Sequence, residues 1–207
     1  MVVFAALLAI NAIAAKIDNR RAPEFWVYPA QTIMCSALLV WFRREYRMEA
    51  PRRPLFALFT GAIVFAIWIS PQAFFGSAAR LDGFNPDLLS SNVLYWAELV
   101  LRFVRLVVVV PLVEEIFWRG FLLRVLIDDD FDRVPFGTFS WPSFSIVTIA
   151  FALSHAPPDW PAALVAGALY NVVAYRTKSL SSCVVAHAVT NMFLGLWIMQ
   201  TKQWGFW

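Results

Sequence analysis

The sequence predicts an all-α fold, a polytopic transmembrane bundle of seven to eight helices that forms one domain over residues 1–207. Two observations predict it. Of the 207 residues, 60% are hydrophobic and only 15% are charged. That composition would leave large exposed apolar patches on a soluble globule, whereas it suits helices that face lipid. In addition, apolar stretches near the roughly 20 residues needed to cross a bilayer recur along the chain.

Charge and cysteine content exclude several other classes. The net charge of +3 comes from 17 basic and 14 acidic residues that are scattered along the chain, so we expect no nucleic-acid partner. Cys35 and Cys183 both lie in apolar runs, and no CxxC spacing is present. A disulfide framework and a zinc finger are therefore excluded.

The first half of the chain contains three apolar runs that we interpret as spans, at 2–15, 25–42 and 55–69. The first run lacks a cleavage site, so we expect it to be retained. The densest basic cluster lies between the second and third runs and consists of Arg43, Arg44, Arg47, Arg52 and Arg53. The positive-inside rule places this loop and the N-terminus in the cytoplasm. Residues 70–92 are a mixed loop on the opposite side.

The next apolar stretch, 93–127, is too long for one span, because about 1.5 Å per residue gives roughly 50 Å of helix. Near its start, polar residues recur at i, i+4 and i+7: Glu98, Arg102 and Arg105. Such a stripe suits an interfacial or packed helix start. We therefore expect a division that leaves 106–127 as the spanning part, with a kink at Pro111.

Three further helices are predicted at 144–155, 159–175 and 180–199. Pro157 and Pro158 stop the first of them, and Asp159 is a good N-cap for the second. The chain closes with an aromatic tail of the kind found at membrane interfaces: Trp204, Phe206 and Trp207.

Two adjacent glutamates lie in the apolar run before residue 127. An ionisable residue in a span costs about 3 kcal/mol or more, so each needs a reason. Glu115 is four residues before Arg119, the favourable orientation for a helical ion pair, and we interpret it as a structural counter-charge. Glu114 points about 100° away and has no such partner, so we interpret it as a candidate general base.

The only two histidines, His155 and His187, both fall in predicted apolar helices. His187 and Asn191 are spaced i and i+4, which puts both side chains on one helix face and allows them to aim two donors at one oxygen. Glu114 and His187 lie at similar depths, about 10 to 12 Å into their spans. We therefore expect them to line one polar cavity, with His155 nearby.

Together, Glu114-Glu115-x-x-x-Arg119, Phe151-x-x-x-His155 and His187-x-x-x-Asn191 resemble the motif set of the CPBP membrane proteases, a family that includes the type II CAAX prenyl endopeptidases. Thr177-Lys178-Ser179-Leu180 resembles the family's Thr-Gly-Ser-Leu turn, with Lys178 in place of glycine, and Asn171 stands where a second glycine is common. The closing stretch 203–207 is similar to the bacterial CAAX-protease-related branch associated with exosortase systems.

The resemblance implies an intramembrane glutamic endopeptidase with an eight-helix fold and no metal or other cofactor. In that mapping Glu114 and His155 activate a water, and His187 and Asn191 form the oxyanion hole. Glu115 and Arg119 hold the helix in position, and Phe151 supports the second motif. The implied partners are the lipid bilayer and a membrane-anchored protein or peptide, in the inner membrane of a bacterium. The resemblance leaves the substrate and the oligomeric state open.

Three other interpretations remain open from the residues alone. One glutamate and two histidines can make a His₂Glu zinc site of a metallohydrolase, although no HExxH pattern is present. A proton-coupled transporter or a non-catalytic scaffold could use the same ionisable groups, although no inverted repeat is found. Cys183 lies four residues before His187 and could act as a nucleophile, but this would leave the glutamates and Asn191 without roles.

Overall fold

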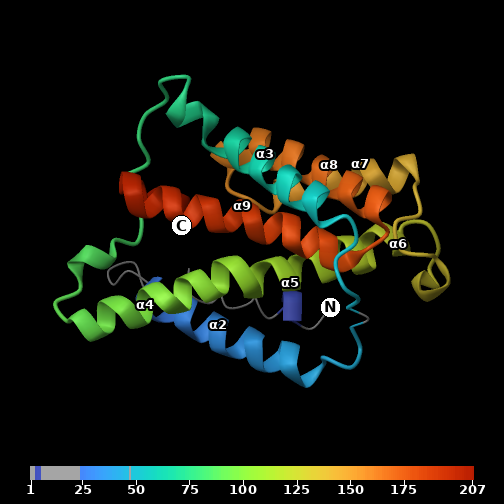
Figure 1. Cartoon of the computed structure of the whole chain (residues 1–207), viewed down its shortest axis with the longest axis horizontal. Coiled ribbons are helices and arrows are strands. Elements are labelled where there is room, and N and C mark those ends of the chain that lie inside the picture. The colour runs from blue at the N-terminus through green and yellow to red at the C-terminus, as the bar shows by residue number, and fades with distance from the viewer. Residues whose placement is uncertain (1–2, 6–23, 47) are drawn as a thin grey trace.

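A computed structural model describes residues 3–5, 24–46 and 48–207 (Figure 1). The described residues form helices and connections without a β-strand, so the predicted all-α class is confirmed. The longer helices are α2 (Glu24–Trp41), α3 (Pro54–Ala73), α4 (Asn92–Val104), α7 (Trp141–Leu153), α8 (Trp160–Thr177) and α9 (Leu180–Thr201). Of the predicted first span, 2–15, only residues 3–5 are described, and they are helical. The rest of it lies outside the described residues.

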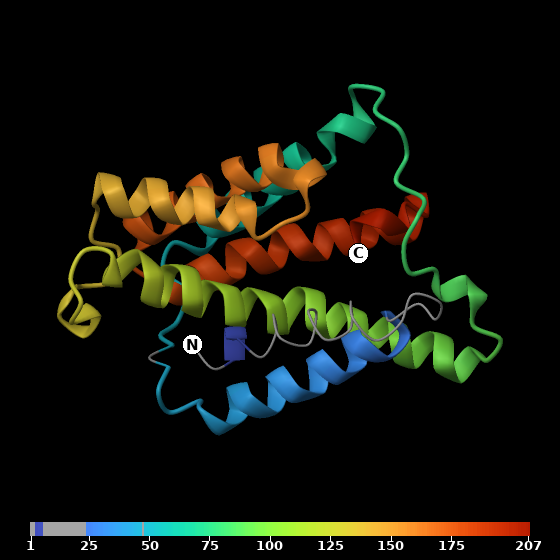
Figure 2. The ribbon, with the colours of Figure 1, turned by 180° about the vertical axis from the view of Figure 1, so that it is seen from behind.

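Helix α9 runs through the middle of the molecule, between α3, α7 and α8 on one side and the α4–α6 segment and α2 on the other (Figures 1 and 2). Helices α3 and α9 approach closely at Gly61, which has no side chain. A Cβ atom at Gly61 would lie 2.4 Å from the carbonyl oxygen of Ala186. The hydroxyl of Thr190 also donates to the Gly61 carbonyl, at 2.9 Å. These contacts bring α3 close behind the polar face of α9.

The stretch after residue 91 forms one continuous helix from α4 through α5 (Val110–Glu115) to α6 (Leu123–Val125), about 50 Å long. The predicted division into an interfacial helix and a separate span from residue 106 is therefore wrong. In place of a break, the helix changes register in two π-helical stretches, Arg105–Val109 and Ile116–Leu122. In the first, the amide of Val110 bonds to the carbonyl of Arg105, five residues back. Wider turns of this kind rotate the side chains that follow, often at functional sites.

Helix α7 begins and ends earlier than predicted. It starts at Trp141, where Pro142 fits the first turn, and ends at Leu153. His155 thus lies in the turn after the helix, and the prediction that it sits inside one is wrong. The residue before a proline disfavours helical geometry, and Pro157 and Pro158 supply no amide hydrogens, so the helix stops before them. Asp159 does precede α8, but its side chain makes no capping hydrogen bond there.

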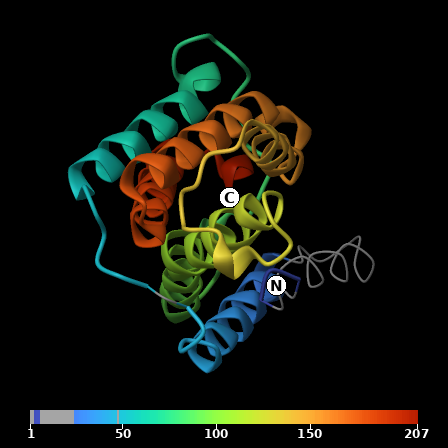
Figure 3. The same cartoon turned by 90° about the vertical axis from the view of Figure 1, so that its right-hand side faces the viewer.

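Two described helices are long and apolar enough to cross a membrane by length and composition, Pro54–Ala73 and Leu180–Thr201, with shorter apolar helices at Val27–Trp41 and Trp141–Leu153. The connections after α2 and α6 and the α8–α9 turn gather at one end of the helices, the end that faces the viewer in Figure 3. Hydrogen bonds join them: Lys178 Nζ donates to the Gly137 carbonyl, and Ser182 Oγ to the Arg52 carbonyl at 2.6 Å. This end carries many of the chain's basic residues.

Candidate active site

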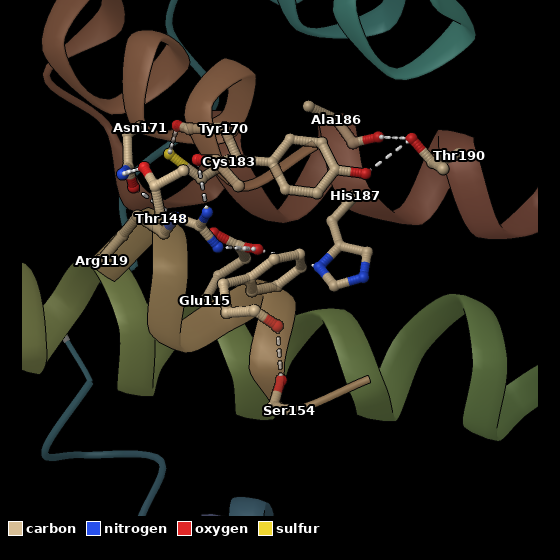
Figure 4. A network of polar contacts seen from close by, with 12 residues as sticks. Glu115, Arg119, Thr148, Ser154, Tyr170, Asn171, Cys183, Ala186, His187 and Thr190 are labelled. Carbon is tan, nitrogen blue, oxygen red and sulfur yellow. Dashed lines mark hydrogen bonds and ion pairs between the residues drawn. The ribbon is translucent and has the colours of Figure 1, made fainter. Parts of the chain in front are cut away.

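The centre of the site is a buried ion pair that also binds a histidine (Figure 4). Arg119 Nη1 donates to Glu115 Oε1 at 3.0 Å, and His187 Nδ1 lies 2.8 Å from the same oxygen. Glu115 and Arg119 are both fully buried. The i, i+4 ion pair predicted from spacing is therefore confirmed. The contact with His187, which is 72 residues away in sequence, joins α9 to the continuous helix from α4 through α6, which we call the long helix.

Helix α8 supplies the remaining partners of Arg119. Arg119 Nε donates to Asn171 Oδ1 and Arg119 Nη2 donates to the Gly167 carbonyl, each at 3.0 Å. The amide nitrogen of Asn171 in turn donates to Thr148 Oγ1 on α7, at 3.1 Å. A fully buried guanidinium is tolerable when its donors are used, because the cost of leaving water is offset by these bonds. The fork of Arg119 thus ties its own helix to α8, and Asn171 extends the network to α7.

His187 is held from a second side by Tyr170. The two rings are stacked, with centroids 5.1 Å apart and an angle of 24° between their planes. The Tyr170 hydroxyl donates to Thr190 Oγ1 at 2.7 Å, and Thr190 lies one turn after His187 on α9. The bond to Thr190 holds the Tyr170 ring in place, and stacking against that ring fixes the position and the tilt of the His187 imidazole. Because a carboxylate paired with an arginine can only accept, Nδ1 of His187 carries a hydrogen and Nε2 remains for other chemistry.

Phe151 lies between the two histidines. Its ring centroid is 4.8 Å from that of His155 and 6.3 Å from that of His187, and the Arg119 guanidinium lies 4.9 Å from it. His155 is half-buried and also contacts Trp68 of α3 edge-on, at 5.4 Å. His155 Nδ1 lies 2.8 Å from the Phe151 carbonyl. Since a carbonyl only accepts, Nδ1 carries a hydrogen, and Nε2 is not used by this contact.

Glu114 differs from its neighbour. It is half-buried, and its Oε2 atom is buried with no hydrogen-bond partner among the described residues. The carboxylate of Glu114 interacts electrostatically with the guanidinium of Arg105. The Oε2 atoms of both carboxylates are buried without a hydrogen-bond partner, so the two glutamates differ at their other oxygen: Oε1 of Glu115 contacts Arg119 and His187, whereas no hydrogen bond to Glu114 is found among the described residues. A carboxylate without a protein hydrogen-bond donor, such as Glu114, is suited to accept a hydrogen bond from a water molecule or a proton from a substrate.

Asn191 is nearly buried, and its amide nitrogen donates to the Leu106 carbonyl at 2.8 Å. This carbonyl lies in the first π-helical stretch, where each amide bonds five residues back. Its donor in that register would be the amide of Pro111, which has no hydrogen. Asn191 therefore satisfies a backbone acceptor that the proline leaves open. The structure directs His187 and Asn191 to two different oxygens of the long helix, and one Nδ2 hydrogen of Asn191 remains for a further acceptor.

Sequence reasoning missed Gly167, Tyr170 and Thr190 as parts of the site. The first two stand at i and i+3 on α8 with Asn171 at i+4, a polar face in an otherwise apolar helix. Thr190 lies between His187 and Asn191 in sequence. On both helices the sequence signal for these residues was a row of polar side chains spaced three or four residues apart.

The described residues contain no group of three or more His, Cys, Asp or Glu side chains placed to hold a metal ion. Glu115 and His187 contact each other, but Phe151 separates His187 from His155.

Residues 96–193 match the family model described as Type II CAAX prenyl endopeptidase Rce1-like. This segment includes the long helix, α7, α8 and most of α9, and it contains all the residues of the motifs from Glu114 to Asn191. No curated protein and no solved structure matches the chain. The family resemblance inferred from the three motifs is thereby confirmed over this segment.

Proposed function

Because residues 96–193 belong to the Rce1-like family of type II CAAX prenyl endopeptidases, we propose that the chain is an intramembrane endopeptidase that hydrolyses a peptide bond of a membrane-anchored protein or peptide. Glu114 is the general base that activates the attacking water. The observation that carries this assignment is the difference between the adjacent glutamates. Oε1 of Glu115 is engaged by Arg119 and His187, whereas no hydrogen bond to Glu114 is found among the described residues; the buried Oε2 atoms of both glutamates lack a partner there.

The reaction requires four groups in this proposal. Glu114 takes a proton from the water as its oxygen attacks the scissile carbonyl, and Nε2 of His155 accepts a hydrogen bond from the same water and orients it. Negative charge then develops on the carbonyl oxygen, and when the C–N bond breaks, the proton held by Glu114 passes to the leaving amine. Nε2 of His187 and the second Nδ2 hydrogen of Asn191 donate to that oxygen. In this proposal His187 donates from Nε2 while Nδ1–H is directed at Glu115, so both ring nitrogens act as donors at that step.

We also propose that the chain is a multi-pass membrane protein. The outward side chains of α3 and α9 are apolar where a water-soluble helix would carry polar groups: Leu55, Phe59, Phe193 and Leu196 are all exposed. Arg52 and Arg53 of the connection before α3 share one end of the helices with Arg176 and Lys178. By the positive-inside rule that end is cytoplasmic, in the inner membrane of a bacterium.

The experiment that tests this function uses the purified full chain in proteoliposomes. A panel of synthetic peptides carries one scissile stretch with a prenyl anchor, an acyl anchor or a transmembrane anchor, and mass spectrometry locates each cleavage. We expect hydrolysis of at least one anchored peptide at a single position and none of its unanchored counterpart. Equal cleavage of soluble peptides would contradict a membrane-anchored substrate.

Asn191 separates the catalytic assignment from a purely structural one. We expect Asn191→Ala to lower kcat by about 10² to 10³-fold with little change in KM, because an oxyanion donor acts only as charge develops. A residue that only satisfies the Leu106 carbonyl would instead lower stability by about 1 kcal/mol and leave turnover unchanged. Single-turnover kinetics and thermal unfolding measure the two effects. Thr201→Val, which removes a hydroxyl bonded to the Trp197 carbonyl near the end of the same helix, is the control for loss of a backbone hydrogen bond.

A metal-free reaction is expected on the ligand geometry. We predict that dialysis against a strong chelator leaves kcat within about twofold of its starting value, because in the described part of the chain the contact between Glu115 and His187 is not joined by a third candidate ligand. Activity and metal content are measured on the same sample. Loss of activity that returns with stoichiometric zinc would assign the site to the His₂Glu metallohydrolase instead.

A further inference from the structure

The connection between α3 and α4 packs against the end of the chain, at the end of α9 (Figure 2). The Arg80 amide donates to Gln203 Oε1 at 3.2 Å, and the Gly205 amide donates to the Arg80 carbonyl at 2.9 Å. The Arg80 guanidinium also lies 4.4 Å from the centroid of the Phe206 ring. The two backbones approach so closely that a Cβ atom at Gly205 would lie 2.8 Å from the Asp82 carbonyl oxygen. Arg80 is therefore fixed at both its backbone and its side chain.

The side chain of Arg80 reaches the turn that carries His155. Its Nη1 and Nη2 atoms donate to the two carboxylate oxygens of Asp159, at 2.6 and 3.2 Å. Only 20% of the Arg80 side chain and 18% of the Asp159 side chain are exposed. Asp159 stands directly before α8, where an aspartate usually bonds to its own helix amides, but here it makes no such bond. Its carboxylate is directed to Arg80 instead.

Two hydrogen bonds hold together the turn that runs from His155 to Trp160. The Asp159 amide donates to the Ala156 carbonyl at 2.8 Å. Trp160, the next residue, donates from Nε1 to the carbonyl of His155 itself, at 2.9 Å. Residues 155–160 thus form a small turn whose position depends on the position of Asp159. Arg80 bonds to both carboxylate oxygens of Asp159, and this bidentate geometry sets the orientation of the carboxylate as well as its distance.

We propose that Arg80 and Asp159 are positioning residues for His155. The pair ties the His155 turn to the C-terminal tail and places Nε2 of His155 against the water that Glu114 activates. This inference rests on the proposed role of His155. It also gives a function to residues 80 and 203–206, which lie outside the segment that matches the family model. A displacement of about 1 Å of a catalytic group can cost up to about 10²-fold in rate, so a remote ion pair can matter for kcat.

The test measures kcat, KM and thermal unfolding of the full chain in proteoliposomes, with the best-cleaved peptide of the anchored panel as substrate. The variants are Arg80→Met, Asp159→Asn, the charge-exchanged double variant Arg80→Asp/Asp159→Arg, and Arg80→Lys as the mildest change. The matched control is Asp87→Asn. It breaks the exposed Lys202–Asp87 ion pair, at 2.8 Å, which also joins the α3–α4 connection to the C-terminal end but does not touch the His155 turn.

We expect each single loss to lower kcat by roughly tenfold or more with KM within about twofold, the double variant to recover most of that loss, and Asp87→Asn to match wild type. Wild-type kcat for Arg80→Met, an equal loss for Asp87→Asn, or no recovery in the double variant would overturn the proposal. His155→Gln is measured alongside. If it is inactive while Arg80→Met is fully active, the proposed function stands and this inference fails. If His155→Gln is fully active, the proposed role of His155 fails first.

Discussion

Replacing Glu114 with glutamine is expected to lower kcat by about 10² to 10⁴-fold without unfolding the protein, because the amide has the shape of the carboxylate but cannot accept the proton of the attacking water. The side chain is only half-buried, and its Oε2 atom has no protein donor to lose. Single-turnover hydrolysis of an anchored peptide in proteoliposomes measures the effect, and thermal unfolding confirms that the variant is folded.

The adjacent residue provides a matched control. Glu115→Gln keeps an oxygen that can accept from Arg119 and His187 and removes only the charge, so we expect its main effect on stability. Its turnover per folded molecule should fall far less than that of Glu114→Gln. If Glu114→Gln hydrolyses peptide at the wild-type rate, or if Glu115→Gln is the more inactive of the two, the assignment of the base is wrong.

Arg119→Met is expected to destabilise the protein by about 3 to 5 kcal/mol, the largest effect on stability that we predict. Removing the cation leaves Glu115 as a buried carboxylate with His187 as its remaining donor, and an uncompensated buried charge is costly. The Gly167 carbonyl and Asn171 Oδ1 lose their donors as well. Arg119→Lys should recover little of the loss, because an ammonium cannot reproduce the three-way fork.

Unfolding is measured in detergent for the variant and for Arg133→Met. Arg133 pairs with Asp130 at 2.7 Å, and both side chains are largely exposed, so its loss should change stability by at most about 1 kcal/mol. Replacing both buried charges, in Arg119→Met/Glu115→Leu, should be less destabilising than Arg119→Met alone. Equal stability of Arg119→Met and Arg133→Met would mean that the buried pair does not support the fold.

Several features were predictable because they depend on residues that are close in sequence. Composition and apolar run length predicted an all-α fold and the extents of α3 and α9 to within a few residues. The Glu115–Arg119 pair followed from i, i+4 spacing, since one turn of helix brings such residues together whatever surrounds them. The same holds for the three short motifs, each of which lies on one helix or at its end, and these are the residues that carry the family resemblance.

Other features depend on how helices rotate and cross, which spacing within one helix does not determine. Residues 92–125 remain in one helix because the helix changes register in its π-helical stretches. Asn191 of α9 stabilises the first of them, just before Pro111, by donating to the Leu106 carbonyl. The difference between Glu114 and Glu115 as acceptors depends in part on His187, which reaches Glu115 from α9.

The amino-acid sequence by itself determined which residues are polar within apolar helices and which neighbours along each helix can pair. Only the tertiary structure decided that His187 bonds to Glu115 and stacks on Tyr170, and that Arg80 reaches the turn that carries His155. The physical reason is that side-chain contacts between helices require close approach, and close approach here depends on single small residues such as Gly61, whose effect appears only when the partner backbone is in place.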